Sequence, residues 1–207
     1  MGDPAGHQEP ARVLARRRRE LRLAGLSRSF LILHGLEGSG PGHWQTWLAA
    51  RLREHGEAVR YPDLPEPFEP QPDDWLAVLR TELDALDGER VVLCHSLGCL
   101  LWLLHARDGA RAAADRVLLV APPCLREVAA VERFWPEGVT AADVERACPA
   151  TLMVWSAPDP YCPASAPAAF PGVFPRAIEI PGGGHLNTDA GYGPWPLVEQ
   201  WALGETG

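Results

Sequence analysis

The stretch Val91-Val92-Leu93-Cys94-His95-Ser96-Leu97-Gly98 decides the fold. Its apolar first half predicts a buried strand, and the apolar residues after it recur at helical spacing, which predicts a helix over Leu97–Arg107. The serine between them, followed by Gly98, is typical of a nucleophile elbow, a strained strand-to-helix turn that raises a serine hydroxyl above a sheet. Cys94 replaces the usual first glycine of this turn and is larger but still compact. The alternative is that Ser96 only caps the helix that follows.

The rest of the chain from Phe30 onward alternates short apolar runs with longer amphipathic stretches, the pattern of a parallel sheet with crossover helices. The order of the strands in the sheet cannot be read from this pattern. A proline-rich stretch over Pro62–Pro72 predicts a surface connection. The predicted strands are Ser29–His34, Glu57–Tyr61, Arg90–His95, Arg116–Ala121, Thr151–Ser156 and Arg176–Ile180. The predicted helices are His43–Glu54, Asp73–Leu86 with Asp73 as its N-cap, Leu97–Arg107 and Pro194–Leu203.

The segment Pro122–Pro149 is the least regular part of the chain. It contains Phe134 and Trp135, for which two interpretations stay open. These aromatic side chains either cover the mouth of a site at the carboxyl edge of the sheet or pack into the core.

A serine hydroxyl needs a base to become a nucleophile, so the elbow calls for a histidine and an acid further along the chain. Asp159 follows the predicted strand Thr151–Ser156, and His185 follows the strand Arg176–Ile180 on a glycine-rich loop. Because the carboxyl ends of parallel strands share one edge of the sheet, we expect Ser96, Asp159 and His185 to meet there. His185 is then the general base, and Asp159 orients it.

Each of these assignments has an alternative. His185 could be a surface histidine, and Asp159 could serve only as a turn residue before Pro160. Asp143 and Asp189 are rival acids, but neither directly follows a predicted strand.

The first predicted strand ends in His34-Gly35-Leu36-Glu37-Gly38-Ser39-Gly40, a glycine-rich loop at the same sheet edge. Such a loop can approach a carbonyl oxygen closely and form an oxyanion hole. The two expected donors are the backbone N–H groups of Leu36 and of Leu97. A phosphate-binding loop is not expected, because no GK[ST] ending follows and the chain contains no lysine.

These features predict a compact α/β-hydrolase fold, with a mostly parallel sheet of about six strands flanked by helices. The predicted activity is hydrolysis of small carboxylic esters, thioesters or amides through an acyl-enzyme, which needs no cofactor and no metal. The alternative from another class is a protein-binding module on a hydrolase scaffold with little catalytic activity. An intact serine, histidine and acid favour the enzyme.

Composition predicts one domain over residues 29–207 and an arginine-rich extension over residues 1–28, which carries seven of the 19 basic residues against three acidic ones. The formal net charge of the whole chain is −8, so the core domain is acidic and nucleic-acid binding by it is not expected. No apolar run is long enough to span a membrane. The five scattered cysteines suggest neither a disulfide framework nor a zinc site, and the expected location is therefore the cytoplasm.

Several further motifs resemble the small serine-hydrolase family that includes retinoblastoma-binding protein 9 and many bacterial homologues. The resemblance spans nearly everything from Phe30 to Trp201. It rests on His34-Gly35 followed by Gly42-His43-Trp44 and Trp47-Leu48, on His95-Ser96-Leu97-Gly98, on Ser156–Pro163, and on Gly184-His185 through Gly193-Pro194-Trp195-Pro196.

This resemblance implies a lidless fold with a triad of Ser96, Asp159 and His185, acting on a small-molecule substrate of undefined identity. Family members often carry a second aspartate just before the triad acid, and Pro158 stands there in this chain. The retinoblastoma-pocket motif Leu-x-Cys-x-Glu is absent around all five cysteines, so that partner is not expected. Neither the natural substrate nor the oligomeric state follows from the sequence.

Five residues near the predicted triad are candidates for lining the site. His43 and Trp44 are equally well explained as a helix-start histidine and a core tryptophan. The five candidates for the lining are His34, Gly35, His43, Trp44 and His95.

Three cysteines also lie near the predicted triad in the sequence. Cys94, Cys99 and Cys162 are expected to be small packing residues rather than reactive thiols.

Overall fold

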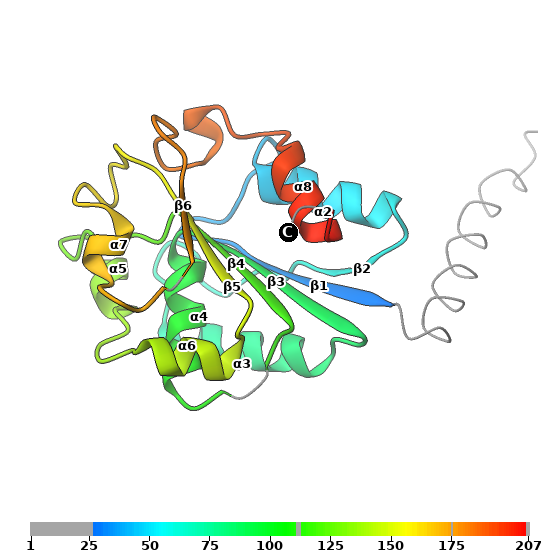
Figure 1. The fold of residues 1–207 in the computed structure, drawn as a ribbon, viewed down its shortest axis with the longest axis horizontal. Helices are drawn as coiled ribbons and strands as arrows, with labels where there is room; N and C mark the ends of the chain where they lie inside the picture. The colour runs from blue at the N-terminus through cyan, green and yellow to red at the C-terminus, as the bar shows by residue number, and fades with distance from the viewer. Residues whose placement is uncertain (1–26, 111–112, 175, 206–207) are drawn as a thin grey trace, which may run out of the picture.

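Six parallel strands form one sheet at the centre of the molecule, in the spatial order β2-β1-β3-β4-β5-β6 (Figure 1). The computed structural model describes residues 27–110, 113–174 and 176–205. The predicted extension therefore lies outside the described residues as far as residue 26, and Arg28 already belongs to the first strand. The strands are β1 Arg28–Leu33, β2 Ala58–Arg60, β3 Glu89–His95, β4 Arg116–Val120, β5 Thr151–Trp155 and β6 Ala177–Glu179.

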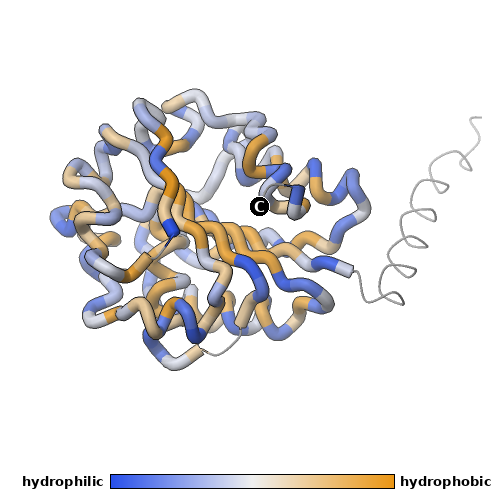
Figure 2. Tube along the Cα trace, in the orientation of Figure 1, coloured by the Kyte–Doolittle hydropathy of each residue, from blue (hydrophilic) through white to orange (hydrophobic). Residues whose placement is uncertain are grey.

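The central strands are buried on both faces of the sheet, which explains why they read as continuous apolar runs. In β1, Leu31 and Leu33 belong to one core cluster, whereas Phe30 and Ile32 belong to the other. This alternation follows from the two-residue period of a strand. Figure 2 shows the strands as a hydrophobic band between flanking helices of mixed hydropathy. The architecture confirms the predicted α/β-hydrolase fold.

Helices cover both faces of the sheet (Figure 1). On one face lie α2 (Trp44–Glu54) and α8 (Pro196–Leu203). On the other lie α3 (Pro72–Asp84), α4 (Leu97–Arg107) and α6 (Ala141–Ala147). Because α4 packs directly against the sheet, nine of its eleven residues are buried, and this fixes the turn at which it begins.

One predicted helix start is wrong. Helix α3 begins at Pro72 with Gln71 as its N-cap, so Asp73 lies in the first turn and does not cap the helix. Proline is well suited to the first helical position, since its fixed φ is helical and its missing N–H would have no partner there. Asp73 and Asp74 then place negative charge near the positive end of the helix dipole.

The irregular segment between β4 and β5 contains two short helices that the sequence pattern did not predict, α5 (Ala129–Arg133) and α6. Phe134, directly after α5, is fully buried and packs edge-on against Trp75 with ring centroids 5.1 Å apart. Trp135 stacks on Phe170. Of the two interpretations for Phe134 and Trp135, the structure thus supports packing.

Two of the cysteines form a disulfide, contrary to the expectation that none would pair. Cys124, after β4, is bonded to Cys162, after β5. The expectation that Cys162 is a free packing thiol is therefore wrong. Because the two residues are 38 positions apart in the chain, their proximity depends on the fold and leaves no local sequence signal. The cysteines therefore no longer support the expected cytoplasmic location.

None of the helices in the described part of the chain is long and apolar enough to cross a membrane.

Candidate active site

Ser96 lies on a tight turn between β3 and α4, with φ 52° and ψ −123°. An L-residue in this region of backbone space is strained and persists only when its surroundings hold it. The Ser96 N–H donates to the carbonyl of Val120 on the neighbouring strand, 3.0 Å away. This turn has the geometry expected of a nucleophile elbow.

The turn needs a glycine at position 98 but not at position 94. A Cβ atom on Gly98 would lie 2.7 Å from the carbonyl oxygen of Leu33 and 2.8 Å from that of His34, both on rigid backbone. Cys94 lies within β3, fully buried in the core, so its side chain fills a packing site instead of crowding the turn. The replacement of the first glycine is therefore compatible with the elbow.

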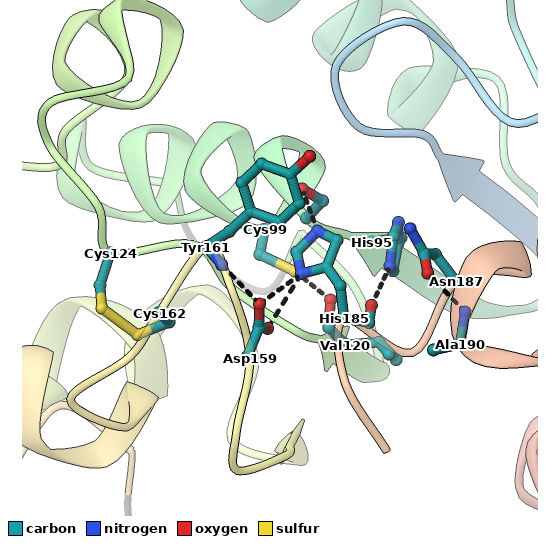
Figure 3. A network of polar contacts seen from close by, with 11 residues as sticks. His95, Cys99, Val120, Cys124, Asp159, Tyr161, Cys162, His185, Asn187 and Ala190 are labelled. Atoms are coloured by element: carbon teal, nitrogen blue, oxygen red, sulfur yellow. Dashed lines mark hydrogen bonds and ion pairs between the residues drawn. A yellow bond between two sulfur atoms is a disulfide. The ribbon is translucent and has the colours of Figure 1, made fainter. Parts of the chain in front are cut away.

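Three side chains meet at this turn in the arrangement predicted from the sequence, and Figure 3 shows two of them, His185 and Asp159, facing each other. The Nε2 atom of His185 lies 2.9 Å from the Oγ atom of Ser96. The Nδ1 atom of His185 lies 2.9 Å and 3.0 Å from the two carboxylate oxygens of Asp159. Asp159 and His185 are both buried, so solvent competes little for these hydrogen bonds.

The loop that carries Asp159 is fastened by contacts on both sides (Figure 3). The backbone N–H of Tyr161 donates to the Asp159 carboxylate at 2.8 Å. In turn, the N–H groups of Cys124 and Leu125 both donate to the carbonyl of Tyr161, and the disulfide joins the same two loops. These bonds hold the carboxylate at a fixed place without the second aspartate that Pro158 replaces.

His185 is also held from two sides. His95 Nε2 donates a hydrogen bond to the backbone carbonyl of His185 at 3.0 Å, and the rings of these two residues lie 5.0 Å apart. The ring of Tyr161 contacts the imidazole with centroids 4.4 Å apart. The glycine-rich loop before His185 is thus anchored to the strand that carries Ser96.

His34 does not line the cavity above Ser96, contrary to expectation. Its Nε2 atom accepts from the N–H of Leu64, so the proton of the neutral ring is on Nδ1, which donates to the Gly35 carbonyl at 2.8 Å. In a planar trans peptide this carbonyl and the N–H of Leu36 point in opposite directions. His34 therefore orients the peptide unit whose N–H is one of the two predicted oxyanion donors.

Trp44 is the second residue that does not line the cavity. It is fully buried and packs edge-on against Trp195 and His95, because the first turn of α2 directs it into the core beneath the site. Leu97, whose N–H is the other predicted donor, is the first residue of α4 and has no intrahelical acceptor there.

A cavity of about 370 Å³ opens above Ser96. Gly35, His43 and His95 line it as expected, together with Leu36, Leu97 and His185. The rest of the wall was not predicted from the sequence. Tyr161 lies within the motif Ser156–Pro163 and could have been found from it, and three further wall residues belong to the glycine-rich loop after β1. The others carried no signal that they line a cavity. The further lining residues are Glu37, Gly38, Gly40, Pro123, Val128, Ala130, Val131, Tyr161, Asn187, Thr188 and Asp189.

Burial keeps the histidines around the triad neutral. It lowers the pKa of His34, and it lowers the pKa of His95 far more because that ring is enclosed and faces His185 and His43. Burial together with the nearby His185 lowers the pKa of His43 to about 4. Burial raises the pKa of the Cys99 thiol, which fits a packing role and not a nucleophilic one.

The two rival acids lie elsewhere. The Asp143 carboxylate accepts from the N–H of Thr140 at 2.9 Å, which completes a capping box at the start of α6. Asp189 lies in the cavity wall within a short 3-10 helix (Thr188–Ala190), whereas the His185 Nδ1 atom is bonded to Asp159.

Comparison with known proteins decides the family. The model of the serine hydrolase family matches residues 30–202. The chain belongs to the serine hydrolase family. Among its relatives, the putative hydrolase YdeN of Bacillus subtilis is 25% identical to this serine hydrolase over 179 residues, covering 84% of this chain and 93% of YdeN.

Solved structures agree on the fold of this serine hydrolase. The crystal structure of the Bacillus subtilis ydeN gene product superposes with a TM-score of 0.72 at 22% identity, over 86% of this chain and 97% of that chain. A YdeN-like hydrolase from Pectobacterium atrosepticum gives 0.65 at 21% identity, over 91% and 94% of the two chains. Est1E from Butyrivibrio proteoclasticus, solved with ferulic acid, gives 0.64 at 18% identity, over 86% and 87%.

Substituting Gly35 tests the close approach of the first loop to the serine. A Cβ atom on Gly35 would lie 2.7 Å from Ser96 Cβ and 3.3 Å from the His95 carbonyl oxygen. One of the two loops must shift, and a misplacement of about 1 Å in a catalytic site can reduce the rate by about 10²-fold. We expect Gly35→Ala to lower kcat for 4-nitrophenyl butyrate by about that factor.

Gly42→Ala is the matched control in the same connection between β1 and α2. Its added methyl group would meet only Thr188 Cγ2 at 3.5 Å, an ordinary contact. Equal turnover by the two variants would show that the approach of Gly35 to Ser96 does not matter for the reaction.

Proposed function

We propose that this serine hydrolase cleaves small carboxylic esters, thioesters or amides through an acyl-enzyme on Ser96, with His185 as the general base and Asp159 as the residue that orients it. The observation that carries the proposal is the relay of short contacts from Ser96 Oγ to His185 Nε2 (2.9 Å) and from His185 Nδ1 to Asp159 (2.9 Å). A serine, a base within hydrogen-bonding reach and an acid behind that base make up the arrangement that activates a hydroxyl.

In the acylation half of the reaction, Ser96 Oγ forms a bond to the carbonyl carbon of the substrate while its proton passes to His185 Nε2. The carbonyl oxygen becomes an oxyanion that accepts hydrogen bonds from the N–H groups of Leu36 and Leu97. The bond to the leaving group then breaks, and His185 gives its proton to the departing atom. Asp159 keeps the remaining proton of the imidazole on Nδ1 and stabilises the imidazolium.

Deacylation repeats these steps with water. His185 accepts a proton from a water molecule whose oxygen forms a bond to the acyl carbon. The bond from that carbon to Ser96 Oγ then breaks, and the proton returns from His185 to Ser96. The products are a carboxylic acid and the original enzyme, and the residues named here supply every proton transfer.

The cavity favours a small substrate with an apolar acyl group. Its volume of about 370 Å³ is at the lower end of ordinary ligand pockets. The wall formed by Val128, Ala130 and Val131 is apolar and lies on the segment between β4 and β5, whereas residues 187–189 come two to four positions after His185 in the chain. The acyl group then belongs against the apolar wall, and the leaving group belongs beside His185, which must protonate it.

Labelling by a fluorophosphonate probe tests the proposal, because phosphonylation requires an activated serine beside an oxyanion hole. We expect one adduct per chain, located by peptide mass spectrometry on Ser96, and prior incubation with an ester substrate should slow its formation. Protein unfolded in urea is the control and should not react. A folded protein that stays unlabelled would favour the binding-module alternative.

A further inference from the structure

His43 is the N-cap of α2, and this role fixes its tautomer. Its Nδ1 atom accepts a hydrogen bond from the backbone N–H of Gln45 at 3.2 Å. An amide N–H can only donate, so Nδ1 must carry its lone pair and the proton of the neutral ring must be on Nε2. His43 therefore presents one fixed donor, the Nε2–H group.

The orientation of the His43 ring is fixed by packing. The ring lies with its centroid 4.7 Å from that of His95 and 5.6 Å from that of Trp44, and the residue is only 5% exposed. His95 is itself bonded to the His185 backbone, so these rings form a rigid group beneath the loop that carries the base. A donor held in this way loses little conformational entropy when it binds a ligand.

The donor is directed to the cavity. His43 lines the same cavity as Ser96 and His185, and of its two ring nitrogens only Nδ1 has a hydrogen-bond partner among the described residues. The low pKa of His43, about 4, keeps the ring neutral near pH 7, so it adds no positive charge beside His185. Because burying a charged group without an opposite charge is costly, a neutral donor in a partly buried site favours an uncharged acceptor on the ligand.

The side of the cavity on which His43 lies determines which part of the substrate it meets. His43 and His185 are close enough to interact electrostatically, and residue 42 lies against Thr188 in the segment after His185. The proton that His185 delivers goes to the departing atom, so the leaving group must lie beside His185. His43 therefore faces the leaving group and not the acyl group.

We propose that the Nε2–H group of His43 donates a hydrogen bond to the leaving group, so that the enzyme favours substrates whose leaving group carries an ether, hydroxyl or carbonyl oxygen close to the departing atom. The expected class is the acyl esters of glycols, polyols and similar oxygen-rich alcohols. This inference rests on the proposed function, because the side of the leaving group is assigned from the role of His185. Among the described residues that line the cavity there is no arginine, so a phosphate or carboxylate on the leaving group would meet no permanently charged cation there.

The test compares 2-methoxyethyl butyrate with n-butyl butyrate, in which one CH₂ group replaces the ether oxygen. The hydrolysis of 4-nitrophenyl butyrate first establishes that the enzyme is active. We expect the ratio of kcat/KM for 2-methoxyethyl butyrate to kcat/KM for n-butyl butyrate to fall about 3- to 10-fold when the His43 donor is removed. A change of this size corresponds to one net hydrogen bond. A ratio within one protein is independent of the fraction of active enzyme.

Two variants separate the cavity role of His43 from its capping role. His43→Asn keeps an acceptor where Nδ1 caps Gln45 but does not reach the Nε2 position, so the ratio should fall while Tm is retained. His43→Gln keeps a donor near Nε2 but loses the cap, so the ratio should be retained while Tm falls. If His43→Asn leaves the ratio unchanged, the inference is wrong and the proposed function stands. No turnover of any ester by the natural protein would overturn the inference, and no turnover of esters, thioesters or amides would overturn the proposed function as well.

Discussion

Ser96→Ala is expected to lower kcat/KM for 4-nitrophenyl butyrate by about 10⁴- to 10⁶-fold. The variant keeps Cβ and the backbone of the turn but lacks the Oγ atom that lies 2.9 Å from His185 Nε2. Without that atom no acyl-enzyme can form, and residual turnover depends on the oxyanion hole and on substrate binding alone. Steady-state hydrolysis followed at the absorbance of 4-nitrophenolate measures the loss.

The variant should fold as the natural protein does. Alanine meets the same steric strain as serine at φ 52°, and the backbone bond to Val120 does not involve the side chain. Circular dichroism and Tm provide the control. Undiminished turnover by a folded Ser96→Ala protein would remove the basis of the proposed mechanism.

The features that could be predicted well from the sequence are those that depend on local patterns of residues. The bounds of α4, Leu97–Arg107, match the prediction because a buried helix next to a strand leaves a continuous apolar signal. The positions of Asp159 and His185 followed from another local fact, that each lies in the loop after a strand, together with the rule that parallel strands end at one edge. Proximity of the three side chains then required no knowledge of the strand order.

The features that the sequence did not predict depend on tertiary contacts. The roles of His34 and His95 are set by backbone partners at Leu64 and at His185, 30 and 90 positions away. The apolar wall at Val128 and Val131 lies in a segment without clear periodicity, since α5 has only five residues. Short helices of this kind are stabilised by packing and not by their own sequence.

Asp159→Asn is expected to lower kcat by about 10⁴-fold, which corresponds to about 5.5 kcal/mol of transition-state stabilisation. The asparagine has nearly the shape of the aspartate, but its amide has one oxygen and one nitrogen where the carboxylate has two acceptors. Both carboxylate oxygens lie within 3.0 Å of His185 Nδ1, and Oδ1 also accepts from the N–H of Tyr161. If the N–H of Tyr161 donates to the oxygen of the new amide, the amide nitrogen faces His185 and donates to its Nδ1 atom. The proton of the imidazole must then be on Nε2.

That tautomer is wrong for catalysis, because an Nε2 atom that already carries a proton cannot accept one from Ser96. The neutral amide also cannot stabilise the imidazolium that forms during acyl transfer. The loss should therefore appear in kcat for acylation, measured by single-turnover kinetics, with little change in substrate binding. A variant with normal kcat would exclude Asp159 as the residue that orients His185.

Asp143→Asn is the matched control, since it makes the same chemical change in the rival acid. Asp143 belongs to the capping box of α6, and its carboxylate is bonded to Thr140 and Arg146. Losing part of that cap should cost about 1 kcal/mol of folding stability and leave kcat unchanged. The pair of variants thus separates an acid that sets the histidine tautomer from one that holds a helix end. A loss of kcat in Asp143→Asn with normal kcat in Asp159→Asn would reverse the assignment of the acid.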